Sequence, residues 1–290
     1  MPEQRADPQL AWIEAALAGQ PTEAFQDRLR EELERRIHML MTTGIREGYT
    51  TVTPYVVAVE VDRLIEFAQE AFGAVVTHRT KGPRGGTHCE LRIGDSMLMF
   101  VGGDMVRGQE KLTALHIYVP DTDAVYQQAL AAGAASVAAP EDKPYGERQA
   151  TVKDLAGNLW FIATHMGPTD GALHTVTPYL IRQNAVGMIE FLKAAFRATE
   201  IGLYKMPDGR LMHGILRVGD GALEMGEGEG APSAFYLYVQ DADAVYKQAV
   251  EAGARSLYTP VDQPYGDRVG GVEDAWGNTW YIATYVGQRL

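Results

Sequence analysis

Apolar residues recur along this chain with two different periods, and the two periods follow one another in a fixed order. Residues 55–61 are rich in β-branched side chains, which favours a strand. In residues 62–72 the apolar positions recur at helical spacing, and the run stops at Gly73, a residue type that often ends helices. Three further strand-like runs follow, at residues 74–80, 87–93 and 96–101. This pattern predicts a βαβββ unit.

The same order of elements recurs along the rest of the chain. A second set consists of a strand at 112–120, a helix at 121–132 and strands at 136–139, 148–153 and 159–164. The second half of the sequence then repeats both sets. We therefore expect an α+β protein made of four βαβββ units in series, paired into two modules.

Three short motifs occur twice and show where the chain repeats. They are Thr-Val-Thr-Pro-Tyr, Pro-Tyr-Gly-x-Arg and Asp-x-x-Gly-Asn-x-Trp, and their copies begin at Thr51 and Thr175, Pro144 and Pro264, and Asp154 and Asp274. The first motif repeats after 124 residues and the second after 120, so the second copy is slightly shorter in between. The repeat predicts two modules, at 49–168 and 169–290.

Residues 1–48 lie outside the repeat. Apolar residues at helical spacing in 10–17 and 25–37 predict two short amphipathic helices, and Thr22 is a candidate cap for the second. We expect this N-terminal helical arm to dock on the modules, on another subunit, or on neither.

Composition limits the classes of partner. The net charge of −12 argues against a nucleic-acid partner, because phosphate binding needs clustered Lys and Arg. It suits a cationic ligand, although acidity also serves solubility. Cys89 is the only cysteine, and neither a secretory signal nor an apolar run of membrane-spanning length is present, so we expect a cytoplasmic protein without membrane contact. A monomer with an internal pseudo-dimer and a homodimer both remain open.

The repeated motifs, together with Ile-Glu-Phe before Ala-Phe and His-x-x-Leu-Arg-x-Gly-Asp, resemble the vicinal-oxygen-chelate superfamily. That group contains glyoxalase I, extradiol dioxygenases and bleomycin-resistance proteins, and the resemblance is to its PhnB-like branch and covers about residues 49–287. It implies curved mixed sheets, each made by two βαβββ units, with a concave side that forms a cavity and a convex side covered by helices. It does not give the activity, because the superfamily is chemically diverse.

The alternation of side chains along each strand predicts which residues face that cavity. Apolar residues on one face should pack under the helices, and these include Cys89, Leu91, Ile93, Leu98, Phe100, Leu115, Ile117, Leu223 and Met225. The intervening residues should face inward, and they include His88, Glu90, Arg92, Met97, Met99, His116, Tyr118, Glu224, Tyr236 and Tyr238. Trp160 and Trp280 fall on the core side.

Metal-dependent members of the superfamily, as the resemblance implies, place ligands at four inward positions per module, with His, Gln or Glu at three or more. Here those positions hold Thr53, Met99, His116 and Phe161 in the first module, and Thr177, Glu224, Tyr236 and Tyr281 in the second. One ligand-type residue per module is too few for a catalytic metal site, which usually has three protein ligands. If the units paired out of sequence order, His116 and Glu224 would come closer, but two ligands remain too few. His88 and Glu90 share a strand face, where they either chelate an ion or pair with Arg92 or water. We predict no metal and no cofactor.

The inward set is instead rich in tyrosine, which suits an aromatic or heterocyclic ligand. The predicted ligand-binding residues are Tyr55, His88, Met99, Tyr118, Tyr145, Arg148, Tyr179, His213, Tyr236, Tyr238, Tyr265, Arg268 and Tyr281. Arg148 and Arg268 either close the mouth of the cavity or belong to a turn that Gly146 and Gly266 shape.

The sequence thus predicts a metal-independent small-molecule-binding protein of the glyoxalase/bleomycin-resistance type, with an aromatic or cationic ligand. The alternative is a glyoxalase-type lyase, isomerase or dioxygenase in which Glu224 or His116 takes part in the chemistry, because an inward carboxylate on an apolar strand should have a perturbed pKa. In a third arrangement one copy serves as scaffold and the other keeps the site.

Overall fold

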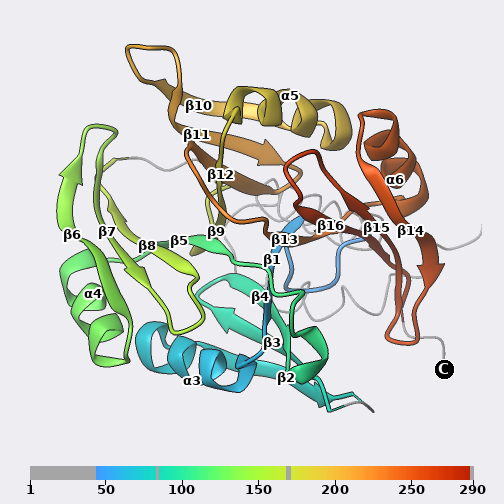
Figure 1. Ribbon diagram of the computed structural model, residues 1–290, viewed down its shortest axis with the longest axis horizontal. Helices are drawn as coiled ribbons and strands as arrows, with labels where there is room; N and C mark the ends of the chain where they lie inside the picture. The colour runs from blue at the N-terminus through green and yellow to red at the C-terminus, as the bar shows by residue number, and fades with distance from the viewer. Residues whose placement is uncertain (1–43, 83–84, 168–170, 288–290) are drawn as a thin grey trace, which may run out of the picture. The chain divides into compact units, whose positions relative to one another are not determined.

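The computed structural model describes residues 44–82, 85–167 and 171–287 (Figure 1). The two helices predicted in residues 10–37 lie outside the described residues. The described residues from Gly44 onward form one compact unit by their contacts.

Four βαβββ units follow one another in this part of the chain, as the sequence predicts. The first unit consists of β1 (Val52–Ala58), α3 (Val61–Phe72), β2 (Val75–Lys81), β3 (Thr87–Ile93) and β4 (Ser96–Gly102). The second consists of β5 (Ala114–Tyr118), α4 (Thr122–Ala131), β6 (Ala135–Lys143), β7 (Glu147–Lys153) and β8 (Leu159–His165), and a short 3-10 helix, η1 (Asp104–Val106), precedes it.

The third unit consists of β9 (Val176–Arg182), α5 (Ala185–Phe196), β10 (Thr199–Lys205), β11 (Leu211–Val218) and β12 (Gly221–Glu227). The fourth consists of β13 (Ala234–Tyr238), α6 (Ala242–Glu251), β14 (Arg255–Asp262), β15 (Asp267–Glu273) and β16 (Thr279–Tyr285). The predicted helix stop at Gly73 is confirmed, since Gly73 has positive φ directly after α3. Gly133 and Gly253 have positive φ directly after the last residues of α4 and α6 and their caps.

The units pair out of sequence order. Sheet I has the strand order β14-β15-β16-β13-β1-β4-β3-β2 and therefore joins the first unit to the fourth (Figure 1). Sheet II has the order β10-β11-β12-β9-β5-β8-β7-β6 and joins the second unit to the third. Each eight-stranded sheet thus takes one half from each sequence repeat.

Pro54 and Pro178 lie inside β1 and β9, where each strand changes its neighbour. β1 pairs with β13 through Val52–Pro54 and with β4 from Tyr55 onward. β9 likewise pairs with β5 up to Tyr179 and with β12 from Tyr179. The strand predicted at 55–61 was placed three residues too late. The strand begins at Val52, and Pro54 lies inside it rather than before it. Proline has no backbone N–H to donate to a neighbouring strand. It is tolerated here because the strand's pairing with one neighbour ends at this point and its pairing with the other begins.

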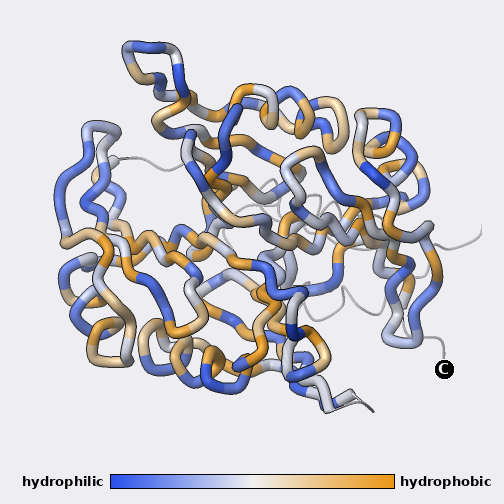
Figure 2. The backbone as a smooth tube through the Cα atoms, in the orientation of Figure 1, coloured by the Kyte–Doolittle hydropathy of each residue, from blue (hydrophilic) through white to orange (hydrophobic). Residues whose placement is uncertain are grey.

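The hydrophobic cores follow the sequence repeats, although the sheets do not. One core collects buried residues of the first two units, including Leu64, Leu91 and Trp160. The other collects buried residues of the last two units, including Leu192, Leu223 and Trp280. In Figure 2 hydrophobic stretches of the tube follow the central strands, whereas the outlying loops are mostly hydrophilic. The predicted core-side positions on β3, β4, β5 and β12 are all fully buried in these two clusters, which confirms the predicted alternation.

Two reciprocal contacts hold the repeats together. The carboxylate of Asp220, in the turn before β12, accepts hydrogen bonds from the backbone N–H and the hydroxyl of Thr51, both at 2.7 Å. The carboxylate of Asp95, in the turn before β4, accepts from the backbone N–H of Thr175 at 2.7 Å. Each repeat therefore uses its Gly-Asp turn to bind the first residue of the other repeat's Thr-x-Thr-Pro-Tyr motif.

The helices of the described part are short, with 12 residues in α3 and in α5, and none combines the length and the apolar character that crossing a membrane requires.

Candidate functional site

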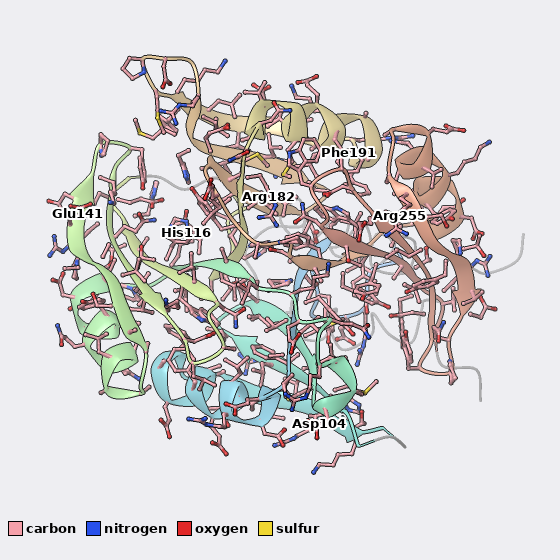
Figure 3. The ribbon with its side chains drawn as sticks, viewed as in Figure 1. Asp104, His116, Glu141, Arg182, Phe191 and Arg255 are labelled. Carbon is pink, nitrogen blue, oxygen red and sulfur yellow. The ribbon has the colours of Figure 1, made fainter. Side chains whose placement is uncertain are left out.

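The pairing of the second unit with the third brings His116, which is labelled in Figure 3, together with Glu224 on the inner face of sheet II. His116 on β5 is in register with Thr177 on β9, and Glu224 on β12 is in register with Tyr179 on β9. The two side chains thus approach each other across the strand between them. His116 Nδ1 lies 2.5 Å from Glu224 Oε2, and both side chains are fully buried.

The imidazole of His116 lies between two carboxylates. Its Nε2 is 3.3 Å from Glu147 Oε2, on β7, and 3.4 Å from the amide nitrogen of Gln149 on the same strand. Burial alone would lower the pKa of His116, but Glu224 and Glu147 together raise it to about 10. Burial alone would raise the pKa of Glu147, but contact with His116 holds it below its ordinary value. The His116 imidazole is therefore protonated at neutral pH and lies between the side chains of Glu224 and Glu147.

Tyr118 connects the two carboxylates. Its hydroxyl lies 3.1 Å from Glu147 Oε1 and 3.1 Å from Glu224 Oε1, so one hydroxyl proton serves both acceptors. Burial and the two carboxylates raise the pKa of Tyr118 far above its ordinary value. The phenol therefore stays protonated, and its ring stacks on His116 with centroids 4.6 Å apart.

His213, on β11, extends this cluster toward a set of aromatic rings. Its Nε2 lies 3.5 Å from Glu224 Oε2, and burial lowers its pKa, so that it is neutral near pH 7. Tyr145 stacks on the His213 ring with an angle of 9° between the ring planes. Tyr179 also stacks on His213, with an angle of 28° between the planes. Tyr145 is only half-buried, so the aromatic set reaches from the buried cluster to the surface.

Three polar atoms of this cluster are buried without a hydrogen-bond partner among the described residues. They are Glu147 Oε2, His165 Nδ1 and His213 Nε2. The 3.3 Å contact of Glu147 Oε2 with His116 is an ion pair whose geometry is not that of a hydrogen bond. A buried polar atom without a partner costs about 1–3 kcal/mol, so this cluster has unused hydrogen-bonding capacity for a ligand.

The equivalent positions on sheet I form a tyrosine cluster. Tyr236 takes the place of His116, Met99 that of Glu224, and Asp267 that of Glu147. Asp267 Oδ2 accepts hydrogen bonds from the hydroxyls of Tyr236 at 2.6 Å and Tyr238 at 3.2 Å. Burial raises the pKa of Asp267 in spite of these two donors. Sheet I thus keeps the tyrosine–carboxylate contact, but Tyr236 and Met99 stand where sheet II has His116 and Glu224.

The remaining predicted residues of sheet I pack against one another. Tyr55 contacts Tyr281 with ring centroids 4.9 Å apart and stacks on Tyr236 at 6.1 Å, and Met99 belongs to the same buried cluster. Tyr265 is 53% exposed. The predicted ligand-binding tyrosines therefore divide into two sets, one on each sheet.

His88 and Glu90 pair with an arginine that the sequence did not point to. Glu90 Oε1 lies 2.6 Å from Arg46 Nη1 and 3.5 Å from His88 Nε2. Burial alone would raise the pKa of Glu90, but His88 and Arg46 lower it to about 2. Arg92, which one of the sequence-based alternatives gave as the partner of these residues, instead donates to the carbonyl of Gly94. Arg46 precedes the repeated part of the sequence, so it has no counterpart in the second repeat that could have pointed to it.

Arg148 and Arg268 lie on the helix side of their sheets. Arg148 pairs with Asp123, in the first turn of α4, and with Asp142 on β6. Arg268 makes the same contacts with Asp243 and Asp262. Neither arginine joins the inward clusters, so they do not close a mouth there. The residue just before each arginine, Glu147 or Asp267, points inward instead; the sequence analysis missed this pair, although it is acidic in both motif copies.

Comparison with known proteins agrees with this architecture. Residues 50–162 and 179–282 match the sequence profile described as the Glyoxalase/Bleomycin resistance protein/Dioxygenase superfamily. The chain belongs to this superfamily. The superfamily fold is therefore present twice along the chain, as two tandem glyoxalase-like modules.

Similar proteins support the fold rather than an activity. Glyoxalase I from Zea mays is 16% identical, with a TM-score of 0.65, and the match covers 81% of this chain and 92% of that one. A putative dioxygenase from Bacillus subtilis is 13% identical, with a TM-score of 0.57, over 83% and 87% of the two chains. An uncharacterized protein of Mycobacterium bovis is 34% identical over 122 residues, covering 37% of this chain and 80% of the relative.

The superfamily implies a metal ion in some members, and the side chains of sheet II decide whether one fits here. Each sequence module has one ligand-type residue at these positions, but the exchange of units places both, His116 and Glu224, on sheet II. The other two positions of sheet II hold Phe161 and Thr177. Both ring nitrogens of His116 face carboxylates, and an imidazole protonated on both has no lone pair for a metal. Within the ranges that the structure describes, no three His, Cys, Asp or Glu side chains are arranged to hold a metal ion. In this arrangement the residues do not fit one.

Proposed function

We propose that this protein binds a small aromatic or cationic compound on the inner face of sheet II, without a metal ion. The observation that carries the proposal is the unused hydrogen-bonding capacity of Glu147 Oε2 and His213 Nε2 beside a set of aromatic rings. An N–H donor of the ligand would satisfy the carboxylate oxygen. The rings of Tyr145 and Tyr179 would supply flat apolar contact.

Charge supports a cationic ligand. Two buried carboxylates, Glu147 and Glu224, face one imidazolium, His116, so the cluster carries an excess negative charge. The chain as a whole also carries a net charge of −12. A cation that reaches the cluster would offset the excess charge, and long-range attraction would speed its approach.

Metal independence rests on the occupancy of the His116 ring nitrogens. A metal would have to displace Glu224 or Glu147 from His116 and remove a proton from an imidazole whose pKa is raised. A neutral or cationic organic ligand needs no such rearrangement.

The test is a ligand screen on chelator-treated protein. A panel of aromatic cations is added, and the melting temperature and the calorimetric stoichiometry are measured, since a ligand at 100 times its Kd stabilises by about 2.7 kcal/mol. Glu147→Gln should abolish the response to the best compound. Asp267→Asn, the matched change on sheet I, should leave it intact.

Two outcomes would refute the proposal. One is tight stoichiometric uptake of a divalent ion by the chelator-treated protein, if ligand binding is seen only after the ion has bound. The other is a ligand whose affinity responds to Asp267→Asn but not to Glu147→Gln.

A second candidate function is an enzyme of the glyoxalase lyase or isomerase type, or a dioxygenase, in which Glu224 or His116 moves a proton. The observation that favours it is the 2.5 Å hydrogen bond between these two fully buried groups, one of which has a strongly raised pKa. Glu224→Gln should then abolish turnover of an identified substrate while its binding persists. Unchanged turnover in that variant would remove Glu224 from the reaction.

A further inference from the structure

The two repeats differ at the last residue of their first strand. β1 ends at Ala58 and β9 ends at Arg182, and the strands match residue by residue from the shared Val-Thr-Pro-Tyr motif. Tyr55 pairs with Met99 and Tyr179 with Glu224, so the register is the same in both sheets. Ala58 and Arg182 therefore occupy equivalent places.

In the second repeat, Arg182 is buried and its guanidinium is bound on several sides (Figure 3). One terminal nitrogen donates to the carbonyl of Ile181 at 2.6 Å. The other donates to Asn278 Oδ1 at 2.5 Å and to the carbonyl of Ala231. Asn278 belongs to the Asp-x-x-Gly-Asn-x-Trp turn, so the guanidinium links the third unit to the fourth.

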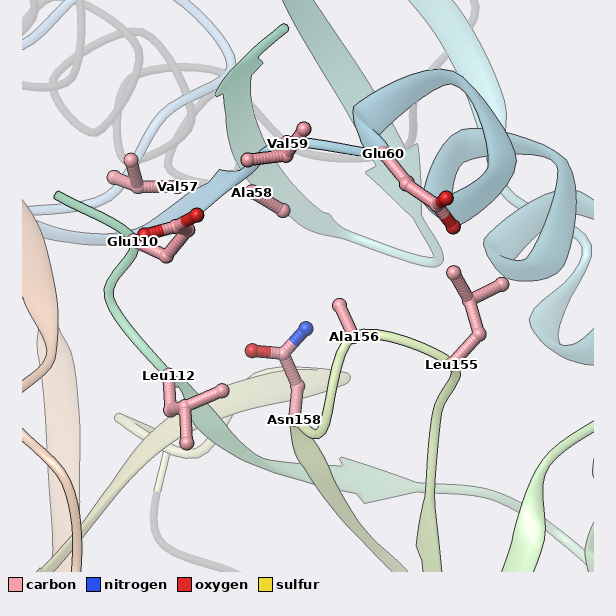
Figure 4. Close-up of a pocket in the computed structure, with 9 residues that line it drawn as sticks. All are labelled: Val57, Ala58, Val59, Glu60, Glu110, Leu112, Leu155, Ala156 and Asn158. Atoms are coloured by element: carbon pink, nitrogen blue, oxygen red, sulfur yellow. The ribbon is translucent and has the colours of Figure 1, made fainter. Parts of the chain in front are cut away.

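In the first repeat, a cavity of about 190 Å³ adjoins the equivalent place (Figure 4). Its wall includes Ala58 and Asn158, the counterparts of Arg182 and Asn278. Asn158 Oδ1 accepts a hydrogen bond from the backbone N–H of Thr113, as Asn278 Oδ1 does from Ser233. The oxygen of Asn278 accepts a second bond from Arg182, whereas no described residue gives Asn158 Oδ1 one.

Glu110 gives the cavity a negative charge that is complementary to the missing group, whereas Glu60 already pairs with Arg63 at 2.9 Å. Glu60 and Glu110 are part of its wall, and their carboxylates appear at its edge in Figure 4. The residue equivalent to Glu60 is Asn184, whose side chain caps α5, while Glu60 makes no capping bond to α3.

The residue equivalent to Glu110, counted back from Thr113 and Ser233, is Gly230. A Cβ at Gly230 would lie 2.9 Å from the Arg182 guanidinium and 2.3 Å from the carbonyl of Ile181. The second repeat therefore has a cation, Arg182, and no side chain at Gly230 beside it. The first repeat has no cation at Ala58 but has a carboxylate at Glu110.

We propose that the cavity between β1 and the Asn158 turn is a binding site for a guanidinium group, which takes the place that Arg182 fills in the second repeat. The group belongs either to a free guanidino compound or to an arginine side chain of a peptide. A volume of about 190 Å³ is below the roughly 300–1,000 Å³ of sites for drug-sized ligands, so only the guanidinium and a short stem enter. The site is separate from the sheet II cluster and does not depend on its function.

The test compares methylguanidinium with methylammonium by calorimetry and by NMR titration of the full chain. Methylguanidinium should bind saturably to one site, at least about tenfold more tightly than methylammonium, because only the planar fork matches several acceptors at once. N-acetyl-arginine N-methylamide is the second arm. Tighter binding of that amide than of methylguanidinium identifies a peptide arginine as the source, and weaker binding identifies a free guanidino compound.

Two variants locate the site. Ala58→Arg places in the first repeat the side chain that the second repeat carries, and should abolish methylguanidinium binding. Glu110→Gln changes an exposed side chain and should fold whether or not Ala58→Arg does; it should weaken binding about two- to fivefold. In the Ala58→Arg/Arg182→Ala double variant, the cavity is opened in the second repeat instead, and methylguanidinium should raise the melting temperature of that protein.

The proposal is overturned if methylguanidinium shows no saturable binding to the wild-type chain, or binds no better than methylammonium. It is equally overturned if binding is unchanged in Ala58→Arg and in Glu110→Gln.

Discussion

His116 and Glu224 are 108 positions apart in the chain, yet their side chains share a 2.5 Å hydrogen bond. The contact exists because the second and third units form one sheet, in which β9 separates β5 from β12. It joins two residues from different repeats into one buried pair, in which the pKa of His116 is raised. The stability of the protein should therefore depend on the protonation of this group.

The first prediction concerns that dependence on pH. The pKa of His116 is raised above its unfolded value, so its contribution to stability is complete below pH 6.5 and is lost as pH rises toward 10. The free energy of unfolding, measured by urea titration, should fall between pH 6.5 and 9. A loss on the order of 2 kcal/mol over that interval is expected.

The control for this prediction removes the whole pair. His116→Gln combined with Glu224→Gln removes the titrating imidazole and one of the two carboxylates that face it, while Glu147 remains. Because the imidazole is gone, the stability of this variant should be nearly flat over the same interval. The interval stops at pH 9 because burial raises the pKa of Cys89 from 9.0, so that its thiol contributes only above that value. An equal slope in the double variant would show that another group is responsible.

The second prediction isolates the electrostatic effect of Glu224. Burial lowers the pKa of His116 and the two carboxylates raise it. In Glu224→Gln one of these carboxylates is lost, so the pKa of His116 should move down toward its ordinary value. NMR titration of the imidazole measures this, and a pKa that does not fall would contradict the buried ion pair.

The third prediction concerns the reciprocal contacts between the repeats. Gly94 has a φ of +57°, and a Cβ there would lie 2.2 Å from Thr175 Oγ1 and 2.8 Å from its Cβ. Gly94→Ala should therefore destabilise by about 3 kcal/mol or more, through backbone strain and the clash together. Gly73→Ala is the matched control, since Gly73 has a φ of +65° with no atom within 4 Å of the added Cβ. It should cost only about 1–2 kcal/mol of strain, and equal losses in the two variants would argue against the contact.

The fourth prediction concerns the turn that supports each last strand. The Asp154 carboxylate accepts hydrogen bonds from the backbone N–H groups of Ala156 and Asn158, from the Asn158 amide and from the Trp160 indole. Asp154→Ala leaves the buried indole N–H without a partner, and should destabilise by on the order of 3–5 kcal/mol in urea unfolding. Asp142→Asn breaks one exposed contact to Arg148 and should cost less than about 1 kcal/mol. A loss in Asp154→Ala no larger than that of the control would refute this role.

The face that each side chain occupies could be predicted from the sequence, because period two is a local property of a strand. Leu91, Leu223 and Trp160 lie in the cores, and His116 and Glu224 point the other way, as predicted. Which strands become neighbours is decided by contacts between distant segments, such as Asp220 with Thr51. Period two carries no information on that choice, so the meeting of His116 with Glu224 was left as an open alternative.

Which residues make up the site was also hard to predict from the sequence, because their contacts depend on distant segments. The sequence-based hypothesis for this motif used Arg148 and not its neighbour Glu147. The predicted strand began at residue 148, and the inward direction of Glu147 follows only when the strand begins at Glu147. Arg46 has no repeated counterpart at all. The pairing of Arg148 with two aspartates could not be seen from the spacing of the motif, since Asp123 comes from a helix 25 residues earlier.

The exchange of halves between the repeats also bears on how the molecule can change. Two separate, identical copies joined in the same way would have twofold symmetry, and every substitution would appear on both inner faces at once. Fusion into one polypeptide lifts that restriction, so Glu224 can persist where its counterpart is Met99, and His116 where its counterpart is Tyr236. The tandem chain can thus hold two unlike inner faces on repeated scaffolds, one with a histidine and a glutamate where the other has a tyrosine and a methionine.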